Sequence, residues 1–190
     1  MKETPILYST EMVKAILDGS KTETRRTRGL ELINLNPDKW SISEIKYIGK
    51  CPYGQQGDVL WVREMFSQKE ERIIYRAQVC SKHDLPDGFK WKPSIHMPKA
   101  AARIWLQVEE IKAERLQDIT SVDAEKEGAV GITKTIAPYA WNDSPTPKQE
   151  FIRLWKSING EDSWEKNPFV WVIKFKLLST TGKPDFNHAA

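Results

Sequence analysis

Strand-like stretches that are separated by helices at irregular intervals most constrain the fold of this chain. Apolar and polar residues alternate over 103–111, and an apolar run rich in β-branched and aromatic residues fills 169–178. Shorter strands are predicted over 58–66 and around 73–77. Because helices do not follow every strand, the repeating rhythm of a parallel α/β fold is missing. The pattern predicts an α+β fold, with a small barrel that carries helices at its ends.

Three helices are predicted from capping residues and helical spacing. The first covers about 10–18 and ends at Gly19, which suits the left-handed turn that closes many helices. The second opens at the TSVD run and ends at Gly128. The third covers 147–158, where a Thr-x-x-Gln capping box and a proline at the first helical position precede apolar residues at helical spacing.

Length and composition predict an ordinary globular protein. The chain has 190 residues, of which 39% are hydrophobic and 29% charged, and this balance is neither that of a disordered chain nor that of a membrane protein. We expect one domain over 1–180 and a frayed tail over 181–190, with irregular structure over 29–56 and a loop over 129–146. No apolar run reaches the roughly 18 residues of a membrane span and no signal-peptide core is present, so we expect a cytoplasmic protein with no membrane partner.

Cysteine and histidine are too sparse to indicate a metal centre. Cys51 and Cys80 are the only cysteines and form no CxxC pair, which argues against a disulfide framework and a zinc knuckle. Cys80, His83 and His96 together supply too few ligands at a familiar spacing. We therefore expect neither a metal nor a cofactor.

A dense group of cations follows the first predicted helix, in the run GSKTETRRTRG at 19–29. Its members are Lys21, Arg25, Arg26 and Arg28. The formal charge of the whole chain is only +3, so the distribution of charge has to carry any argument for nucleic-acid binding. One interpretation is a loop at the helix exit whose cations attract phosphate. The alternative is that Arg25 and Arg26 pair with Glu23 and with the acidic region 109–127.

Glu64 is the odd member of an otherwise apolar strand face. Alternation over 58–66 places it with Leu60, Val62 and Phe66, so its carboxylate needs a partner or a raised pKa if that face is buried. A catalytic role and an ion pair with an arginine such as Arg103 both fit this position.

Tryptophan is abundant, with eight residues in the chain. Trp61, Trp105 and Trp171 lie within predicted strands and are expected in the core. Trp91 stands between Lys90 and Lys92 outside the predicted strands and helices, so it is the best candidate for stacking on a base.

The run ILDGSKTETRR, a helix followed by Gly-x-Lys-x-x-Thr-x-Arg, resembles the signature of the ASCH domains, a branch of the PUA-like superfamily. Five later runs resemble the version of this domain that bacteriophages and prophages carry. They are GDVLWVRE, KPSIHMP, RIWLQVEEIKAERLQDI, FIRLWKSING and NPFVWVIKF. The resemblance covers about residues 4–178.

This resemblance implies a PUA-like β-barrel whose motif residues line a basic, RNA-binding cleft. Small bacterial members hydrolyse N4-acetylcytidine with the motif's lysine and threonine and with a glutamate on a later strand. Carried over, these positions are Lys21, Thr24 and, in place of the glutamate, Gln107. Because an amide cannot act as a general base, another carboxylate has to serve, with Glu64 preferred and Glu109 second.

The leading interpretation is a PUA-like protein that binds RNA or a modified nucleoside in a basic cleft. Lys21, Thr24 and Glu64 are the predicted catalytic positions, and we expect them around one pocket with the Glu64 carboxylate near the Lys21 ammonium. The predicted binding positions are Arg25, Arg26, Arg103, Gln107 and Trp91. The alternatives are a hydrolase, acting on N4-acylated cytidine or as a ribonuclease, and a phage interaction protein without a working site.

Overall fold

The structure is a computed structural model of the 190-residue chain. It describes residues 1–69, 72–79, 85, 89–129 and 145–186. Within these residues, no helix combines the length and the apolar character that crossing a bilayer requires.

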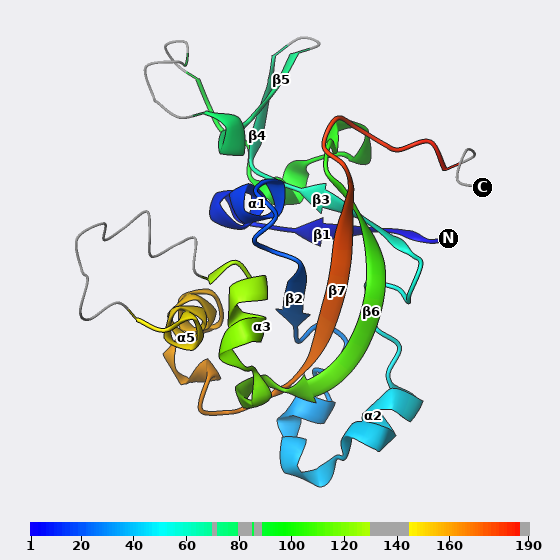
Figure 1. The fold of residues 1–190 in the computed structure, drawn as a ribbon, viewed down its shortest axis with the longest axis vertical. Coiled ribbons are helices and arrows are strands. Elements are labelled where there is room, and N and C mark those ends of the chain that lie inside the picture. The colour runs from blue at the N-terminus through cyan, green and yellow to red at the C-terminus, as the bar shows by residue number, and fades with distance from the viewer. Residues whose placement is uncertain (70–71, 80–84, 86–88, 130–144, 187–190) are drawn as a thin grey trace.

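A mixed five-stranded sheet forms the centre of the molecule (Figure 1). Its strands are β1 (Glu3–Leu7), β2 (Glu23–Arg26), β3 (Val59–Arg63), β6 (Trp105–Arg115) and β7 (Phe169–Ser179), in the spatial order β1-β3-β6-β7-β2. The β1–β3 pair is parallel, and the other neighbours are antiparallel. The expected α+β class is confirmed, and the strands predicted at 58–66, 103–111 and 169–178 are present with shifted bounds.

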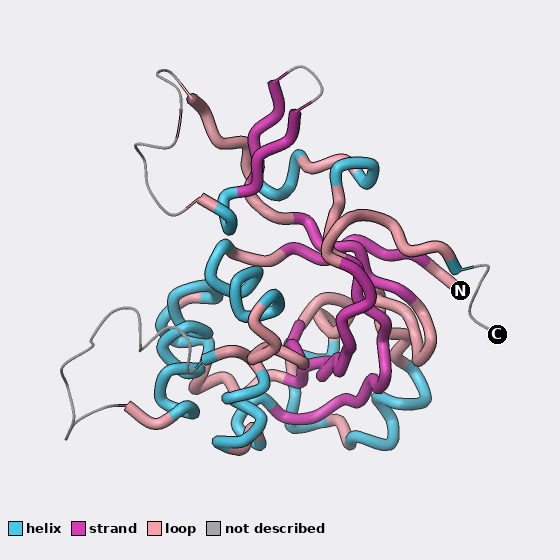
Figure 2. Tube along the Cα trace, turned by 45° about the horizontal axis from the view of Figure 1, so that its top comes forward, coloured by secondary structure: helices cyan, strands magenta, loops and turns pink. Residues whose placement is uncertain are grey.

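Strands β1 and β2 are the two edges of this sheet, so its backbone hydrogen bonds do not close a barrel within the described residues. The sheet is nevertheless curved, and two register shifts along β6 mark where its pairing with β7 is irregular (Figure 2). The Arg26 guanidinium donates to the carbonyl of Leu7 at 3.2 Å, and Leu7 ends the opposite edge strand. A side chain, rather than a strand pair, therefore links the two edges.

The three predicted helices are confirmed as α1 (Thr10–Leu17), α3 (Ser121–Lys126) and α5 (Pro147–Asn159). The Ser9 hydroxyl caps α1, Thr120 and Asp123 form a capping box on α3, and Thr146 and Gln149 form the one on α5. Most of the loop predicted at 129–146 lies outside the described residues.

Helix α2 (Ile42–Ile48) corrects the expectation of irregular structure over 29–56. Ser41 caps its first turn, and the Glu44 carboxylate accepts a hydrogen bond from the Ser41 amide in return. The Ser-x-x-Glu signal for this capping box is present in the sequence. Two short 3-10 turns, Ile33–Leu35 and Pro37–Lys39, precede the helix.

The cationic motif also differs from its expected form, because it is a strand rather than a loop. Residues 23–26 form β2 and pair with β7, so that Thr24 lies opposite Ile173 and Arg25 opposite Val172. Backbone pairing with a long hydrophobic strand places these polar side chains against the sheet, where Thr24 and Arg25 are buried.

The main core lies between the curved sheet and α1, and a second core cluster lies under α3 and α5. Trp61, Trp105 and Trp171 are all buried, as their strand positions predicted. In the second cluster, Phe151 and Trp155 of α5 pack with Leu116 and Ile119. Helix α3 packs against both α5 and β2.

A separate hairpin of β4 (Phe66–Lys69) and β5 (Arg72–Tyr75) projects from the end of β3 (Figure 1). The chain returns to it at Lys92, which exchanges two backbone hydrogen bonds with Phe66. Residues 182–186 are held against the body rather than frayed: the Gly182 amide donates to the Arg103 carbonyl, and Lys183 pairs with Glu3 at 2.9 Å. Residues 187–190 lie outside the described residues.

Candidate functional site

Arg25 is the centre of a buried ion network beneath β2. Only 2% of the residue is exposed. Its guanidinium donates to Glu114 at 2.8 Å, to Glu23 at 2.8 Å and to Glu127 at 3.2 Å. For Arg25 the alternative interpretation is therefore the right one, because this cation pairs with Glu23 and with the acidic region rather than facing solvent.

Lys21 is buried in the same network and joins β2 to the end of α3. Its ammonium donates to the Glu127 carboxylate at 2.7 Å, and to the carbonyls of Glu127 and Glu23 at 2.9 Å each. Burial lowers the pKa of Lys21, while the charge of Glu127 opposes this change. Since an ammonium has three protons and all three meet acceptors, the geometry suits a charged, positioning lysine.

One carboxylate oxygen of Glu23 has no hydrogen-bond partner in this network. Burial raises its pKa, the Arg25 contact opposes that change, and the neighbouring charges of Asp123 and Glu127 add to it. One oxygen binds Arg25, whereas the other is buried without a hydrogen-bond partner. Such an oxygen is stabilised when it carries a proton.

The expected contact between Glu64 and Lys21 is not formed. Glu64 is buried just after β3 and binds Arg103 through both carboxylate oxygens, at 2.8 and 2.9 Å. The Arg103 guanidinium also lies over the Tyr75 ring, 4.3 Å from its centroid. Glu64 and Arg103 thus form the ion pair that the sequence offered as the alternative, at the base of the hairpin, while the carboxylate beside Lys21 belongs to Glu127.

Two other predicted positions lie apart from Lys21. Gln107 is half-buried on β6, opposite Val59 on one side and Lys176 on the other. Trp91 is half-buried beside the hairpin, where Arg76 lies over its ring. Their predicted binding roles remain predictions.

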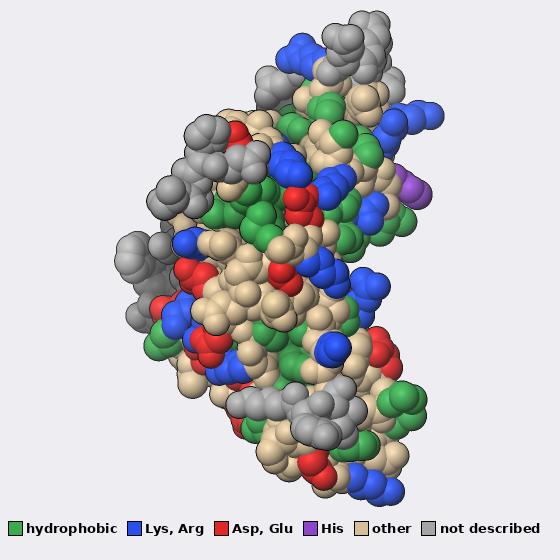
Figure 3. Space-filling view, turned by 90° about the vertical axis from the view of Figure 1, so that its right-hand side faces the viewer, with side chains coloured by type: hydrophobic (Ala, Val, Ile, Leu, Met, Phe, Trp, Pro, Cys, Tyr) green, Lys and Arg blue, Asp and Glu red, His purple; other side chains and the backbone are tan. Residues whose placement is uncertain are grey.

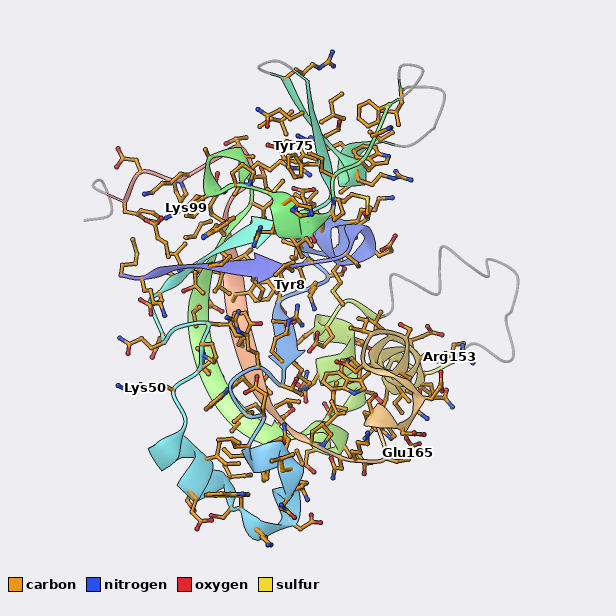
Figure 4. All side chains as sticks on the ribbon, turned by 180° about the vertical axis from the view of Figure 1, so that it is seen from behind. Tyr8, Lys50, Tyr75, Lys99, Arg153 and Glu165 are labelled. Carbon is orange, nitrogen blue, oxygen red and sulfur yellow. The ribbon has the colours of Figure 1, made fainter. Side chains whose placement is uncertain are left out.

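A cavity of about 360 Å³ opens beside the ion network, between the end of β1, the start of α1, β2 and α5. We call it the Tyr8 cavity. Figure 4 shows Tyr8 between the end of β1 and β2. The lining residues are Leu7, Tyr8, Ser9, Met12, Arg25, Arg26, Thr27, Ser94, Glu127, Phe151, Leu154, Trp155, Ile158 and Asn159. Its volume is in the range of small-molecule sites.

Two uncharged polar atoms of residues that line this cavity lack a well-formed hydrogen bond. The Tyr8 hydroxyl and the Trp155 indole N–H are both shielded from solvent and make none among the described residues, although the Thr24 side chain lies close enough to the Tyr8 hydroxyl to influence its pKa. Burial raises the pKa of Tyr8 far above its ordinary value, with Arg26 opposing the change, so the hydroxyl keeps its proton. Unsatisfied buried polar groups are uncommon in native proteins and call for an explanation.

Arg25, Arg26 and Glu127 are the charged residues that line the cavity. Arg26 is partly exposed, lies over the Tyr8 ring at 5.3 Å, and donates to the Thr24 hydroxyl at 2.6 Å. Thr24 itself is fully buried behind it. Of the predicted site residues, the structure therefore brings Lys21, Thr24, Arg25 and Arg26 together.

Sequence reasoning missed the residues that line the cavity from other elements. Tyr8 precedes the cap of α1, and Phe151 and Trp155 have the helical spacing of ordinary core residues. Glu127 was noticed only as one of many acidic residues before Gly128. No local signal in the sequence separates these four side chains from structural ones.

No group of three His, Cys, Asp or Glu side chains in the described part of the chain is arranged to hold a metal ion. His96 is exposed. Cys80 and His83 lie outside the described residues.

No protein-family model and no curated protein matches this chain. Among solved structures, it is similar to the crystal structure of protein EF3133 from Enterococcus faecalis V583, described as family-model DUF984. The two share 9% sequence identity, with a TM-score of 0.40, over 98% of this chain and 86% of that chain. The likeness does not by itself indicate a function.

Proposed function

We propose that this chain is an ASCH-type, PUA-like protein of the phage or prophage kind, and that it binds a base of RNA or a modified nucleoside in the Tyr8 cavity. The carrying observation is that two unpartnered donors, the Tyr8 hydroxyl and the Trp155 N–H, belong to residues that line one aromatic cavity. Leaving such groups unpaired costs about 1–3 kcal/mol each. Both atoms are closed to solvent in this structure, so a ligand recovers this energy when a covering side chain such as Arg26, which lies over the Tyr8 ring, moves aside.

A nucleobase has the chemistry that these walls complement. Its carbonyl oxygens and ring nitrogens accept hydrogen bonds, its flat faces stack on aromatic side chains such as Trp155 and Phe151, and an exocyclic amine can donate to Glu127. Arg26 supplies a cation for a ring face or a phosphate oxygen. A purely apolar ligand would leave both unpartnered donors unsatisfied.

The first experiment compares Tyr8→Phe with the natural chain in titrations with cytidine, N4-acetylcytidine, uridine, adenosine and guanosine. Tyr53→Phe is the matched control, since Tyr53 is equally buried but lies in the main core outside the cavity. Loss of one hydrogen bond should weaken binding by about 5–10-fold in Tyr8→Phe only. If none of the nucleosides binds, or if both variants behave alike, the proposal is wrong.

A hydrolase is the second candidate, because Glu127 supplies a carboxylate that Gln107 does not. Glu127 lines the cavity and lies 2.7 Å from the Lys21 ammonium. In this scheme Glu127, which Lys21 holds in place, takes a proton from water, the water oxygen adds to the acetyl carbonyl of N4-acetylcytidine, and the Arg26 guanidinium stabilises the oxyanion. The bond between the carbonyl carbon and N4 then breaks, N4 takes the proton, and acetate and cytidine are released.

Acetate release from N4-acetylcytidine tests this candidate. Glu127→Gln should lower the rate by about 10²–10⁴-fold, the usual contribution of a general base. Gln107→Glu should change it little, because Gln107 does not line the cavity. Binding of N4-acetylcytidine without turnover would leave the binding protein as the sole interpretation.

A further inference from the structure

The segment that returns to the hairpin reaches the Tyr8 cavity at Ser94, and we propose that this segment and the hairpin form a second nucleotide subsite. We call residues 63–69, 72–79 and 89–103 the basic arm. In this proposal the ligand is a single-stranded RNA rather than a free nucleoside. One base occupies the Tyr8 cavity, the next stacks on Trp91, and the cations of the arm contact the phosphates. The inference rests on the proposed function, which places the first base.

Charge on the basic arm is more concentrated than on the rest of the chain. Residues 63–103 contain nine Lys or Arg and five Asp or Glu, whereas the whole chain has a formal charge of +3. Among the arm's described residues, the acidic one is Glu64, which is buried against Arg103. Figure 3 shows Lys and Arg side chains projecting from the end of the molecule that carries this arm. This surface therefore attracts a polyanion.

Three cations of the arm, Arg76, Lys90 and Lys92, have no ion-pair partner among the described residues, whereas Lys99 pairs with Glu3 at 2.6 Å. Lys90 and Lys92 are exposed, and the Lys92 ammonium lies 5.8 Å from the centroid of the Phe66 ring. Arg76 donates one hydrogen bond to the Val79 carbonyl, which leaves further N–H groups for a phosphate. These three side chains are thus available, in contrast to Lys21 and Arg25.

Trp91 has the setting of a stacking platform. Phe89 packs against it edge to face at 4.8 Å between centroids, and the Arg76 guanidinium lies over its ring at 5.6 Å. The next residue, Lys92, is fixed to β4 by two backbone hydrogen bonds of 2.7 and 3.2 Å to Phe66. The indole is therefore held in place, while part of it remains exposed. An ordered aromatic next to unpaired cations is the usual combination for binding single strands.

The arm is continuous with the Tyr8 cavity. Ser94 lines the cavity and follows Trp91 by three residues, so their Cα atoms are at most about 11 Å apart. The turn that contains Arg76 also packs against α1, whose start forms another wall of the cavity. A strand that leaves the cavity past Ser94 therefore meets Trp91 and Arg76 within its next nucleotides.

The test uses the full chain, cytidine as the free nucleoside, and a single-stranded RNA hexamer of cytidylate. Lys90→Gln combined with Lys92→Gln should weaken hexamer binding and reduce the slope of log affinity against log salt by about 1.4, or 0.7 for each lost contact. Lys39→Gln combined with Lys50→Gln is the matched control, because these exposed lysines flank α2, which lies at the end of the molecule away from the hairpin (Figure 1). Trp91→Ala should weaken hexamer binding by about 10-fold or more. Trp91→Leu keeps the packing against Phe89 and should give a similar loss. Cytidine binding should stay unchanged in all of them.

The outcomes separate this inference from the proposed function. If cytidine binds, but the hexamer binds no more tightly than cytidine and the arm variants leave hexamer affinity unchanged, the second subsite is wrong. The proposed base site in the Tyr8 cavity is then retained. If the arm variants weaken hexamer binding while Tyr8→Phe leaves it unchanged, RNA binding by the arm is supported and the proposed base site in the Tyr8 cavity is wrong. If changes at Lys39 and Lys50 reduce the salt slope as much as those at Lys90 and Lys92, the attraction is a general property of the surface, which overturns the subsite.

Discussion

Two groups of cations in this molecule have the same residue types and opposite surroundings. Lys21 and Arg25 are buried, and every hydrogen bond found for their charged groups ends on a carboxylate or a carbonyl of the protein itself. Arg76, Lys90 and Lys92 lie on the basic arm without an ion-pair partner among the described residues. The first group is paired inside the protein, whereas the second has no such carboxylate partners among the described residues.

The difference teaches that the density of Lys and Arg along a chain does not identify a binding surface. The motif at 19–29 is the denser cluster, but two of its four cations, Lys21 and Arg25, are paired with Glu23, Glu114 and Glu127. Partners that come together only in the fold decide whether a cation is structural or available.

Removing Arg25 from the buried group of cations should cause the largest loss of stability. Arg25→Ala leaves several carboxylates in the interior without their cation, and the loss of one partner from a buried ion network costs about 3–5 kcal/mol of the free energy of unfolding. Urea denaturation of the natural chain and the variant measures this difference. Arg76→Ala, the control from the basic arm, should change stability by less than about 1 kcal/mol. Equal losses in the two variants would show that the buried and exposed groups do not differ as described.

Lys21→Met should cause the next largest loss of stability. The variant keeps much of the volume of the side chain but removes three hydrogen bonds, one of them to the Glu127 carboxylate, and contacts of this kind contribute about 1.5–3 kcal/mol. Glu127 keeps its contact with Arg25, which limits the loss. Lys14→Met, on the exposed side of α1, is the control. Thermal unfolding should separate the two, and an unchanged midpoint for Lys21→Met would mean that Lys21 is not a positioning residue.

The fold was predictable wherever local signals agree with tertiary packing. The capping boxes predicted α3 and α5, and the apolar run at 169–178 predicted β7. Strands β1 and β2 were missed because they are short and because their pairing partners, β3 and β7, lie far away in sequence. Helix α2 was missed although its capping box is present, because Asn, Pro and Gly around it weaken the helical pattern.

The candidate site was predictable only in part. The motif located Lys21, Thr24 and Arg26, which lie together beside Tyr8. It did not locate Glu127, because the contact between Glu127 and Lys21 joins residues 106 positions apart. The apolar setting of Glu64 correctly indicated a need for a partner, but burial alone cannot tell Arg103 from Lys21. The arrangement of the elements in the fold, and not the residue type, decides which carboxylate contacts which cation.

Glu23 should make the stability of the buried group depend on pH, which distinguishes this group from the cations of the basic arm. Its pKa is raised in the folded chain, mainly by burial, so the folded state holds this proton at pH values where the unfolded chain has lost it. This contribution to stability is full below the unfolded pKa of Glu and falls as pH rises through the folded pKa. Glu23→Gln imitates the protonated form, so its stability relative to the natural chain should increase over the pH range that begins at the unfolded pKa of Glu, about 4.3. A difference that is constant across this range would show that Glu23 titrates normally.

The smallest change in stability should come from the exposed group itself. Lys90→Ala combined with Lys92→Ala removes two solvated ammonium groups and one cation–π contact with Phe66, and an exposed contact of that kind contributes about 0.5–1 kcal/mol. The double variant should therefore unfold within about 1 kcal/mol of the natural chain, a fraction of the loss expected for Arg25→Ala. Its circular dichroism spectrum should be unchanged, because Lys92 is held to β4 through backbone rather than side-chain atoms. If the double variant instead lost as much stability as Arg25→Ala, these lysines would be structural residues, and the contrast between a buried, paired group and an exposed, available one would fail.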